Sequence, residues 1–262
     1  MQCKRFHIEV CKKEGGKTMR LSEYYGIQEA IKADVLQSEE SYLKLLKVVG
    51  ANQRYSFENQ LSIYDLCPQA TACADFDFWR EHFGRTVMRG QKGIPILDVN
   101  AGYKRVRYVF DVSQTTSMNK EVNEVAIWKF REQDQQALKE MIEAKGYDHS
   151  ESQLEVIVEN IYTLARIFGD EKIYEVMNEL RIEDSDRLAF EKFLRESICY
   201  AVGSRYGISY PMDMDNLREN YAYLDSITFP LMGEMISEVS GTIIDQTIQK
   251  SKEIDRRLEL SR

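Results

Sequence analysis

The residues best suited to chemistry lie between Ala51 and Val112, where basic, aromatic and amide side chains are interleaved along the chain. Such a mixture suits a surface that holds a flexible polyanion, because cations meet phosphates and flat rings stack on exposed bases. The expected chemistry is therefore noncovalent binding. The candidate contact residues are Arg54, Tyr55, Asn59, Gln60, Tyr64, Trp79, Arg85, Arg89, Lys92, Arg105, Arg107 and Tyr108.

One short segment, Arg89-Gly90-Gln91-Lys92-Gly93, brings two glycines next to two cations. Glycines let a backbone approach a phosphate closely and present its N–H groups. A turn that enters a strand explains the same glycines, with Arg89 and Lys92 as solvated side chains. The segment lacks the GxxxxGK[ST] pattern of a nucleotide-binding P-loop. Both interpretations, a phosphate contact and a simple turn, stay open.

A second basic pair, Arg105 and Arg107, lies at alternate positions of an expected strand. Alternation places both side chains on one face of that strand, where they would extend a positive track from Arg89 and Lys92. The alternative is that the pair forms the polar outer face of a hairpin.

The aromatic and amide candidates also have structural alternatives. Trp79 lies among phenylalanines, so it either packs in a core or stacks on a base. Asn59 and Gln60 can read a base edge, or they can brace a loop from within.

Enzyme chemistry has little support in the sequence. The three histidines are isolated from one another, and the chain contains neither HExxH nor CxxC. Cys67, Cys73 and His82 lack the paired spacing of a structural zinc site. The five cysteines are odd in number and widely spaced, which argues against a disulfide framework. We expect a protein that is not an enzyme and that uses no metal and no cofactor.

Periodicity predicts an α+β protein. Helices are expected over residues 21–50, 56–66 and 75–83, and the period then changes to two over residues 94–99 and 106–110, which predicts a β-hairpin. A short strand is expected over residues 5–10. From residue 119 the pattern is helical, with apolar stripes over 154–168 and 186–206 and a last helix that starts near Pro230.

The chain is expected to divide into two modules within the polar stretch 113–120. The first, residues 1–118, is a small α/β module with the hairpin, and the second, residues 119–262, is mainly α-helical. Residues 1–110 carry 17 Lys and Arg against 13 Asp and Glu, a net charge of +4, whereas residues 111–262 carry 18 against 30, a net charge of −12. Such asymmetry indicates two units with different partners, although an acidic helical bundle with solvated faces explains it equally well.

Three sequence pieces within residues 38–112 carry a family resemblance. They are Tyr55 with Asn59-Gln60-Leu61, then Ala70-Thr71-Ala72-Cys73 leading to Phe78-Trp79, and Val87-x-Arg89-Gly90-x-Lys92-Gly93-Ile94 followed by Tyr108-Val109-Phe110-Asp111-Val112. The stretch resembles the N-terminal domain of ArdC-type antirestriction proteins, in the variant found in multidomain proteins of Gram-positive conjugative elements.

The resemblance implies a small α/β domain that binds single-stranded DNA and protects or processes DNA during transfer between cells. Two departures stand out. ArdC carries a zinc-metallopeptidase domain with HExxH, which this sequence lacks, and its glycine-rich entry segment is replaced here by Asn52-Gln53-Arg54-Tyr55. The second half of the chain resembles the helical region that follows this domain in the conjugative-element proteins.

Two other functional classes stay open. The acidic half could imitate DNA and bind the basic groove of a host-defence protein, such as a restriction or CRISPR enzyme. A scaffold or oligomerisation module is the third reading, served by the apolar last helix. No apolar run approaches the roughly 18 residues of a membrane span, and the N-terminus lacks a secretory pattern, so we expect a cytoplasmic protein.

Overall fold

The fold was obtained as a computed structural model, which describes residues 19–100, 102–118, 125–147, 153–221 and 223–260. The helices of this part are α1 (Leu21–Val35), α2 (Glu39–Ala51), α3 (Phe57–Leu66), α4 (Phe76–Phe83), α5 (Gln135–Glu143), α6 (Gln153–Glu179), α7 (Arg187–Tyr206), α8 (Met214–Tyr221) and α9 (Thr228–Leu260), with short 3-10 turns η1 (Val112–Gln114) and η2 (Glu132–Asp134). The strands are β1 (Cys73–Ala74), β2 (Arg85–Val87), β3 (Ile94–Asn100), β4 (Tyr103–Asp111) and β5 (Thr115–Ser117).

The protein is α+β, with two small antiparallel sheets in the N-terminal half and helices beyond them. One sheet has the strand order β1-β4-β3, and the other pairs β2 with β5. The β3–β4 hairpin forms as expected, with Ile94 opposite Val109 and Asp98 opposite Arg105. Leu97 and Val106 face the buried Tyr24 of α1, so this helix covers one face of the hairpin.

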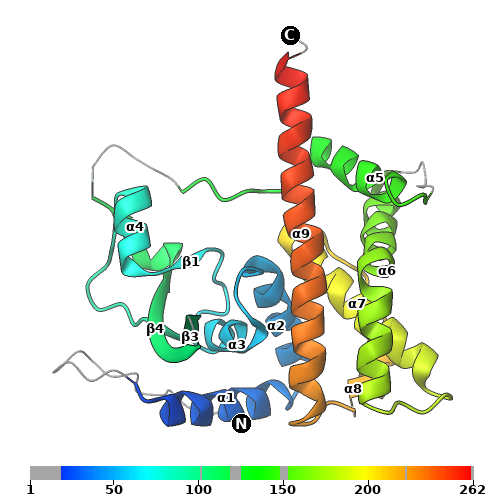
Figure 1. Cartoon of the computed structure of the whole chain (residues 1–262), viewed down its shortest axis with the longest axis horizontal. Coiled ribbons are helices and arrows are strands. Elements are labelled where there is room, and N and C mark those ends of the chain that lie inside the picture. Colours follow the sequence, from blue (N-terminus) through cyan, green and yellow to red (C-terminus); the bar gives the residue numbers. More distant parts are fainter. Residues whose placement is uncertain (1–18, 101, 119–124, 148–152, 222, 261–262) are drawn as a thin grey trace.

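The largest hydrophobic cluster lies among the long helices. α9 runs through the middle of the molecule, between the sheet module on one side and α6 and α7 on the other (Figure 1). Side chains of α2 and α3, such as Leu45 and Phe57, pack in the same cluster as Phe193 of α7 and Ile236 of α9. The core of the helical half thus extends into the first module, and the division at residue 118 stays a prediction.

The backbones of α2 and α7 approach each other closely where the two helices cross. A methyl group on Gly50 would overlap the carbonyl oxygen of Ala201. Glycine is therefore required at this crossing because it has no Cβ, which lets the two backbones approach one another.

Local signals account for several helix ends. The Asp75 carboxylate caps α4 by accepting from the Phe78 N–H at 2.8 Å, and Gly84 ends that helix with a φ of 57°. Gly207 likewise ends α7 with a φ of 73°. Such left-handed residues at helix C-termini favour glycine. The helical stretch expected over 21–50 divides into α1 and α2, because the Ser38 hydroxyl caps α2 by accepting from the Ser41 N–H.

Regular structure continues into the polar stretch 113–120, within which the division into two modules is expected. Residues 115–117 form β5, which pairs with Arg85–Val87. The cause is the buried Asp111, whose carboxylate accepts from the Thr71, Ala72 and Ser113 N–H groups and folds the chain back at η1. The strand expected over residues 5–10 lies outside the described residues.

The cysteines of the described chain are free thiols. Cys67 and Cys199 are buried, and Cys73 is half-buried. Burial raises the pKa of the Cys67 thiol to about 11 and raises those of the other two further. Among the helices of the described segments, none has both the length and the apolar character that a bilayer crossing needs.

Candidate nucleic-acid interface

The outer face of the hairpin carries the expected arginine pair, but acids lie beside it. The Asp98 carboxylate accepts from Arg105 Nε at 2.9 Å and from Arg107 Nη1 at 3.4 Å. Arg107 also forms an ion pair with Asp75 at the start of α4. The Arg105 side chain remains 62% exposed, so it can still reach a ligand. Both arginines share one face, and part of their charge is offset within the protein.

The tip of the hairpin combines an exposed ring with an exposed cation. Tyr103 is 81% exposed, and neighbouring Val99 is 60% exposed. The next residue, Lys104, places its ammonium 5.9 Å from the centre of the Tyr25 ring and 3.3 Å from the Tyr25 hydroxyl. We call the set Tyr25, Val99, Tyr103, Lys104 and Arg105 the hairpin surface.

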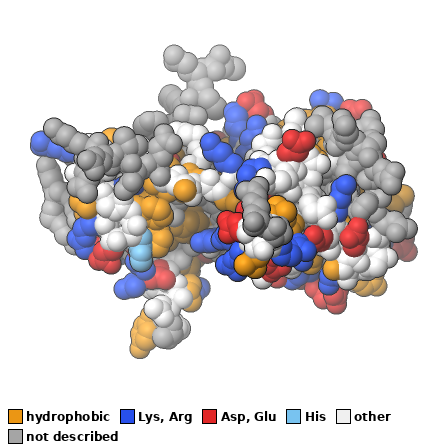
Figure 2. Space-filling model, turned by 90° about the horizontal axis from the view of Figure 1, so that it is seen from above, with side chains coloured by type: hydrophobic (Ala, Val, Ile, Leu, Met, Phe, Trp, Pro, Cys, Tyr) orange, Lys and Arg blue, Asp and Glu red, His pale blue; other side chains and the backbone are white. Residues whose placement is uncertain are grey.

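Helix α4 presents two more rings to solvent. Phe76 and Phe78 are 42% and 45% exposed. The Arg80 guanidinium lies 5.6 Å from the centre of the Phe76 ring, and Phe78 contacts the His82 ring. Figure 2 looks onto the side of the molecule where α4 lies, and there hydrophobic side chains gather with Lys and Arg side chains beside them.

Trp79 faces the other way. It is 2% exposed, and its indole N–H donates to the Phe110 carbonyl at 2.8 Å. The ring therefore fixes α4 onto β4, and its burial leaves no open face for a base.

The glycine turn holds two cations in the open. Gly90 has a φ of 87°, and the Gln114 amide donates to the Lys92 carbonyl at 2.9 Å, which fixes the turn against η1. The Arg89 and Lys92 side chains are exposed, and within the described segments neither has a hydrogen bond or an ion pair. Gly93 has a packing role instead, since a methyl group there would crowd the Tyr108 side chain.

The amide candidates brace the backbone in the structure. Asn59 donates to the Leu97 carbonyl at 3.0 Å and accepts from the Leu97 N–H at 2.7 Å, so α3 is fixed to β3. Gln60 donates to the Asn52 carbonyl at 3.1 Å. Both side chains are buried, which keeps them away from a base in solution.

The remaining candidates divide between internal and surface positions. The Tyr55 hydroxyl donates to the Cys73 carbonyl, and burial raises its pKa. Tyr64 packs in part against the core, and Tyr108 is half-buried. The Arg85 guanidinium donates to the hydroxyl and carbonyl of Thr115, so it joins β2 to β5. Arg54 is exposed just beyond α2.

The structure thus separates ten of the twelve candidates by role, while Tyr64 and Tyr108 are half-buried. Arg54, Arg89, Lys92, Arg105 and Arg107 carry charge at or near the surface, whereas Tyr55, Asn59, Gln60, Trp79 and Arg85 hold the module together. The exposed rings Tyr25, Phe76, Phe78 and Tyr103 were missed from the sequence. A signal existed for Tyr103, because a residue next to a hairpin turn is exposed; the exposure of α4 depends on tertiary packing.

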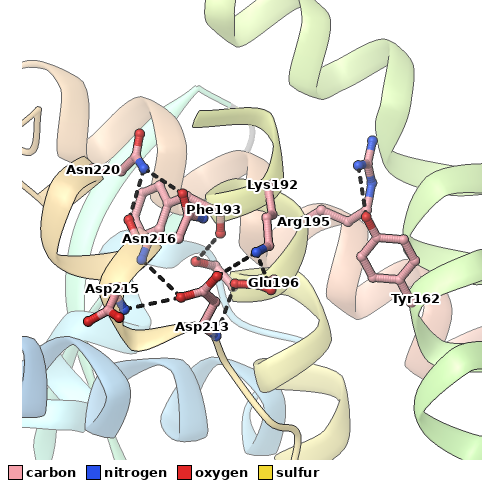
Figure 3. Close-up of polar contacts among 10 residues, drawn as sticks. Tyr162, Lys192, Phe193, Arg195, Glu196, Asp213, Asp215, Asn216 and Asn220 are labelled. Carbon is pink, nitrogen blue, oxygen red and sulfur yellow. Dashed lines mark hydrogen bonds and ion pairs between the residues drawn. The ribbon is translucent and has the colours of Figure 1, made fainter. Parts of the chain in front are cut away.

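The helical half has a pocket of about 560 Å³ between α6, α7 and α8, and charged residues from α7 and α8 contribute to its lining. Lys192 of α7 points to Asp213 and Glu196, whereas Arg195 of α7 points to Tyr162 on α6 (Figure 3). Each cation already has two carboxylate partners, because Arg195 also pairs with Asp170 and Glu191. With Asp215 and Glu219 also in the lining, this wall is acidic overall and does not favour an anion.

Comparison of the chain with protein-family models, with curated proteins and with solved structures gave no match. The resemblance to the ArdC-type domain therefore stands on the quoted motifs, and the functional argument stands on the geometry of the first module.

Proposed function

We propose that the chain is a non-enzymatic protein that binds single-stranded DNA through the hairpin surface and the exposed rings of α4. One observation carries the proposal. Exposed rings lie beside cations in this module, as Tyr25 beside Lys104 and Phe76 beside Arg80, and Tyr103 is largely exposed at the hairpin tip. Stacking of a base on an aromatic side chain contributes about 1–3 kcal/mol and does not depend on which base it is. The cations contact the phosphate backbone of the DNA.

The rigidity of the module supports the same function. Asn59 fixes β3 to α3, Trp79 fixes α4 to β4, and Asp111 fixes the chain after β4. Rings that are held before binding lose less conformational freedom when a ligand arrives. The exposed cations Arg89 and Lys92 of the glycine turn are further candidates to extend the contact along the strand.

The biological setting follows from the resemblance and is part of the proposal. We propose that the protein acts in the cytoplasm, where it protects or handles DNA that a mobile element transfers between cells.

The competing proposal, binding of a basic partner protein, is supported by the acidic pocket of α7 and α8. A carboxylate surplus at Asp213, Asp215 and Glu219 suits a basic partner, such as a host-defence protein.

The test is fluorescence anisotropy of a labelled single strand of about 30 nucleotides, and of its duplex, across a salt series. The protein is expected to prefer the single strand and to bind more weakly as salt rises. Tyr103→Ala is expected to weaken binding roughly tenfold, because one stacked base is lost. The matched control is Tyr174→Ala, which removes a ring that is 59% exposed on α6.

Two results would overturn the proposal. One is the absence of DNA binding at low salt, which would move the search to a basic protein partner. The other is an equal effect of the two tyrosine substitutions, which would show that the hairpin surface does not contact the strand.

A further inference from the structure

The pocket between α6, α7 and α8 combines two kinds of side chain in its lining. On α8, Asp215 and Glu219 are four residues apart, so their side chains lie on one face of the helix. On α7, Leu188 and Lys192 have the same spacing and line the same pocket. The Leu188 side chain is 79% exposed. The pocket therefore joins an acidic row on one helix to an open apolar side chain on another.

The acidic row is not neutralised by the cations around it. Lys192 donates to Asp213 at 2.5 Å, and Arg218 donates to Asp215 at 3.1 Å. The Asp215 side chain nevertheless remains 90% exposed, so a second cation can reach it. Glu219 is exposed and has neither a hydrogen bond nor an ion pair with any described residue. The α8 side of the pocket thus has room and charge for a cation from outside the chain.

The lining also holds two donors that lack an acceptor. Asn216 is 8% exposed, and its Nδ2 atom has no partner among the described residues, whereas its Oδ1 atom accepts from Asn220 at 2.9 Å (Figure 3). Arg195 is 6% exposed, and its Nε atom has no partner among the described residues either. Buried donors are ordinarily paired. A ligand that brings an acceptor into the pocket would therefore complete its hydrogen bonding.

One kind of ligand has all three of the features that this lining requires. A lysine or arginine residue within a peptide carries a positive head group on an aliphatic stem, and its main chain adds carbonyl acceptors. The head group suits Asp215 and Glu219, the stem suits Leu188, and a carbonyl oxygen suits the donors. A polyamine has the charge and the stem but has no carbonyl oxygen.

We propose that this pocket binds a basic segment of a partner protein and takes one of its lysine or arginine side chains between Leu188 and the acidic row of α8. The inference rests on the competing proposal of a basic partner, and it does not require the binding of DNA.

The experiment is fluorescence anisotropy of a short labelled peptide, capped at both ends, in which lysine and arginine alternate with serine. The full chain is titrated into this peptide and into a second peptide with glutamine at every basic position. Spermidine serves as an unlabelled competitor. The chain is expected to bind the basic peptide and not the glutamine peptide, with weaker binding as salt rises.

Three substitutions at exposed positions test the two sides of the pocket. Asp215→Asn and Glu219→Gln are each expected to weaken peptide binding roughly threefold, as for an exposed ion pair. Leu188→Ala changes no charge and is also expected to weaken binding roughly threefold, because the aliphatic stem loses its contact. The control is Glu259→Gln, which removes an exposed acid near the far end of α9 (Figure 1) and is expected to leave binding unchanged.

The results separate this inference from the DNA function. Peptide binding that falls with Glu219→Gln and Leu188→Ala, but not with Glu259→Gln or Tyr103→Ala, supports the pocket whether or not the chain binds a single strand. Absence of peptide binding overturns the pocket, even if strand binding that requires Tyr103 is found. Equal effects of Glu219→Gln and Glu259→Gln would overturn it by showing attraction through net charge alone. Displacement of the peptide by spermidine as effectively as by unlabelled peptide would overturn it in favour of a small polyamine.

Discussion

At the scale of single residues, the acids beside Arg105 and Arg107 set how much positive charge the hairpin surface offers. Asp98 pairs with both arginines, and the hydrogen bond from Arg105 lowers its pKa below the ordinary value. The carboxylate therefore stays ionised at neutral pH and competes with a phosphate for the same guanidinium groups. Ion pairs that are this exposed contribute little to stability, so Asp98 affects binding more than folding.

We predict that Asp98→Asn strengthens the binding of a single strand and steepens its salt dependence. The amide keeps the shape of the side chain but removes the competing charge, which leaves both arginines to the phosphates. Anisotropy across a salt series measures both quantities. The control is Glu40→Gln, which removes an exposed acid from an ion pair with Lys44 on α2. Equal effects of the two substitutions would attribute the change to net charge and reject a local competition at the hairpin.

At the scale of elements, the connection between α7 and α8 depends on a buried carboxyl group. Glu196 of α7 is 6% exposed and accepts from the Asp213 N–H at 3.3 Å. Asp213 in turn caps α8, because its carboxylate accepts from the Asp215 and Asn216 N–H groups. Burial raises the pKa of Glu196, so the folded protein binds a proton at this site more tightly than the unfolded chain does.

Linkage gives the sign of the pH effect. The stability that protonated Glu196 contributes is complete below its unfolded pKa of about 4.5 and is lost as the pH rises through the raised folded pKa. We predict that the unfolding temperature of the unchanged protein falls relative to that of Glu196→Gln as the pH rises above about 4.5. Thermal unfolding followed by circular dichroism measures the difference. Glu219→Gln, which removes an exposed acid from α8, is expected to give a curve without this trend, and a flat difference for Glu196→Gln would contradict the prediction.

The same scale shows what the sequence can and cannot predict. Local residue types were enough to predict α4, because the N-cap at Asp75 and the end of the helix at Gly84 follow from the kinds of residue at these positions. They were enough for the hairpin too, because alternation and turn residues are local signals. They failed for β5, since a strand of three residues exists only through its pairing with β2.

The candidate site follows the same rule. The exposed cations of the glycine turn are found from the sequence, whereas the exposure of the Phe76 and Phe78 rings on α4 depends on tertiary packing.

At the scale of the whole molecule, the two halves share one core across the α2–α7 crossing. The fluorescence of Trp79 follows the unfolding of the sheet module, where the Trp79 indole donates to the Phe110 carbonyl. The helical circular dichroism signal follows mainly the other half, which contains most of the helices. A shared core couples the two, because neither half can open without exposing apolar side chains of the other.

We predict that a Trp128→Phe variant, in which Trp79 is the remaining tryptophan, unfolds in urea with the same midpoint by fluorescence and by helical circular dichroism.

In this background Gly50→Ala is expected to destabilise the protein by about 1–3 kcal/mol or more, because its methyl group meets the Ala201 carbonyl. Gly26→Ala is the control. No atom lies within 4 Å of its added methyl group, so it is expected to stabilise α1 by roughly 0.5–1 kcal/mol. Two separate midpoints would show that the halves unfold independently.

The raised pKa values of the three described thiols have a practical consequence. At neutral pH almost none of Cys67, Cys73 or Cys199 is in the thiolate form that reacts with alkylating reagents. Alkylation of these thiols therefore requires the surrounding structure to open first. The alkylation rate of each thiol then measures the rate of that opening. Because Cys73 lies in β1 and Cys199 in α7, mass spectrometry of partly alkylated protein would time the two halves separately within one sample.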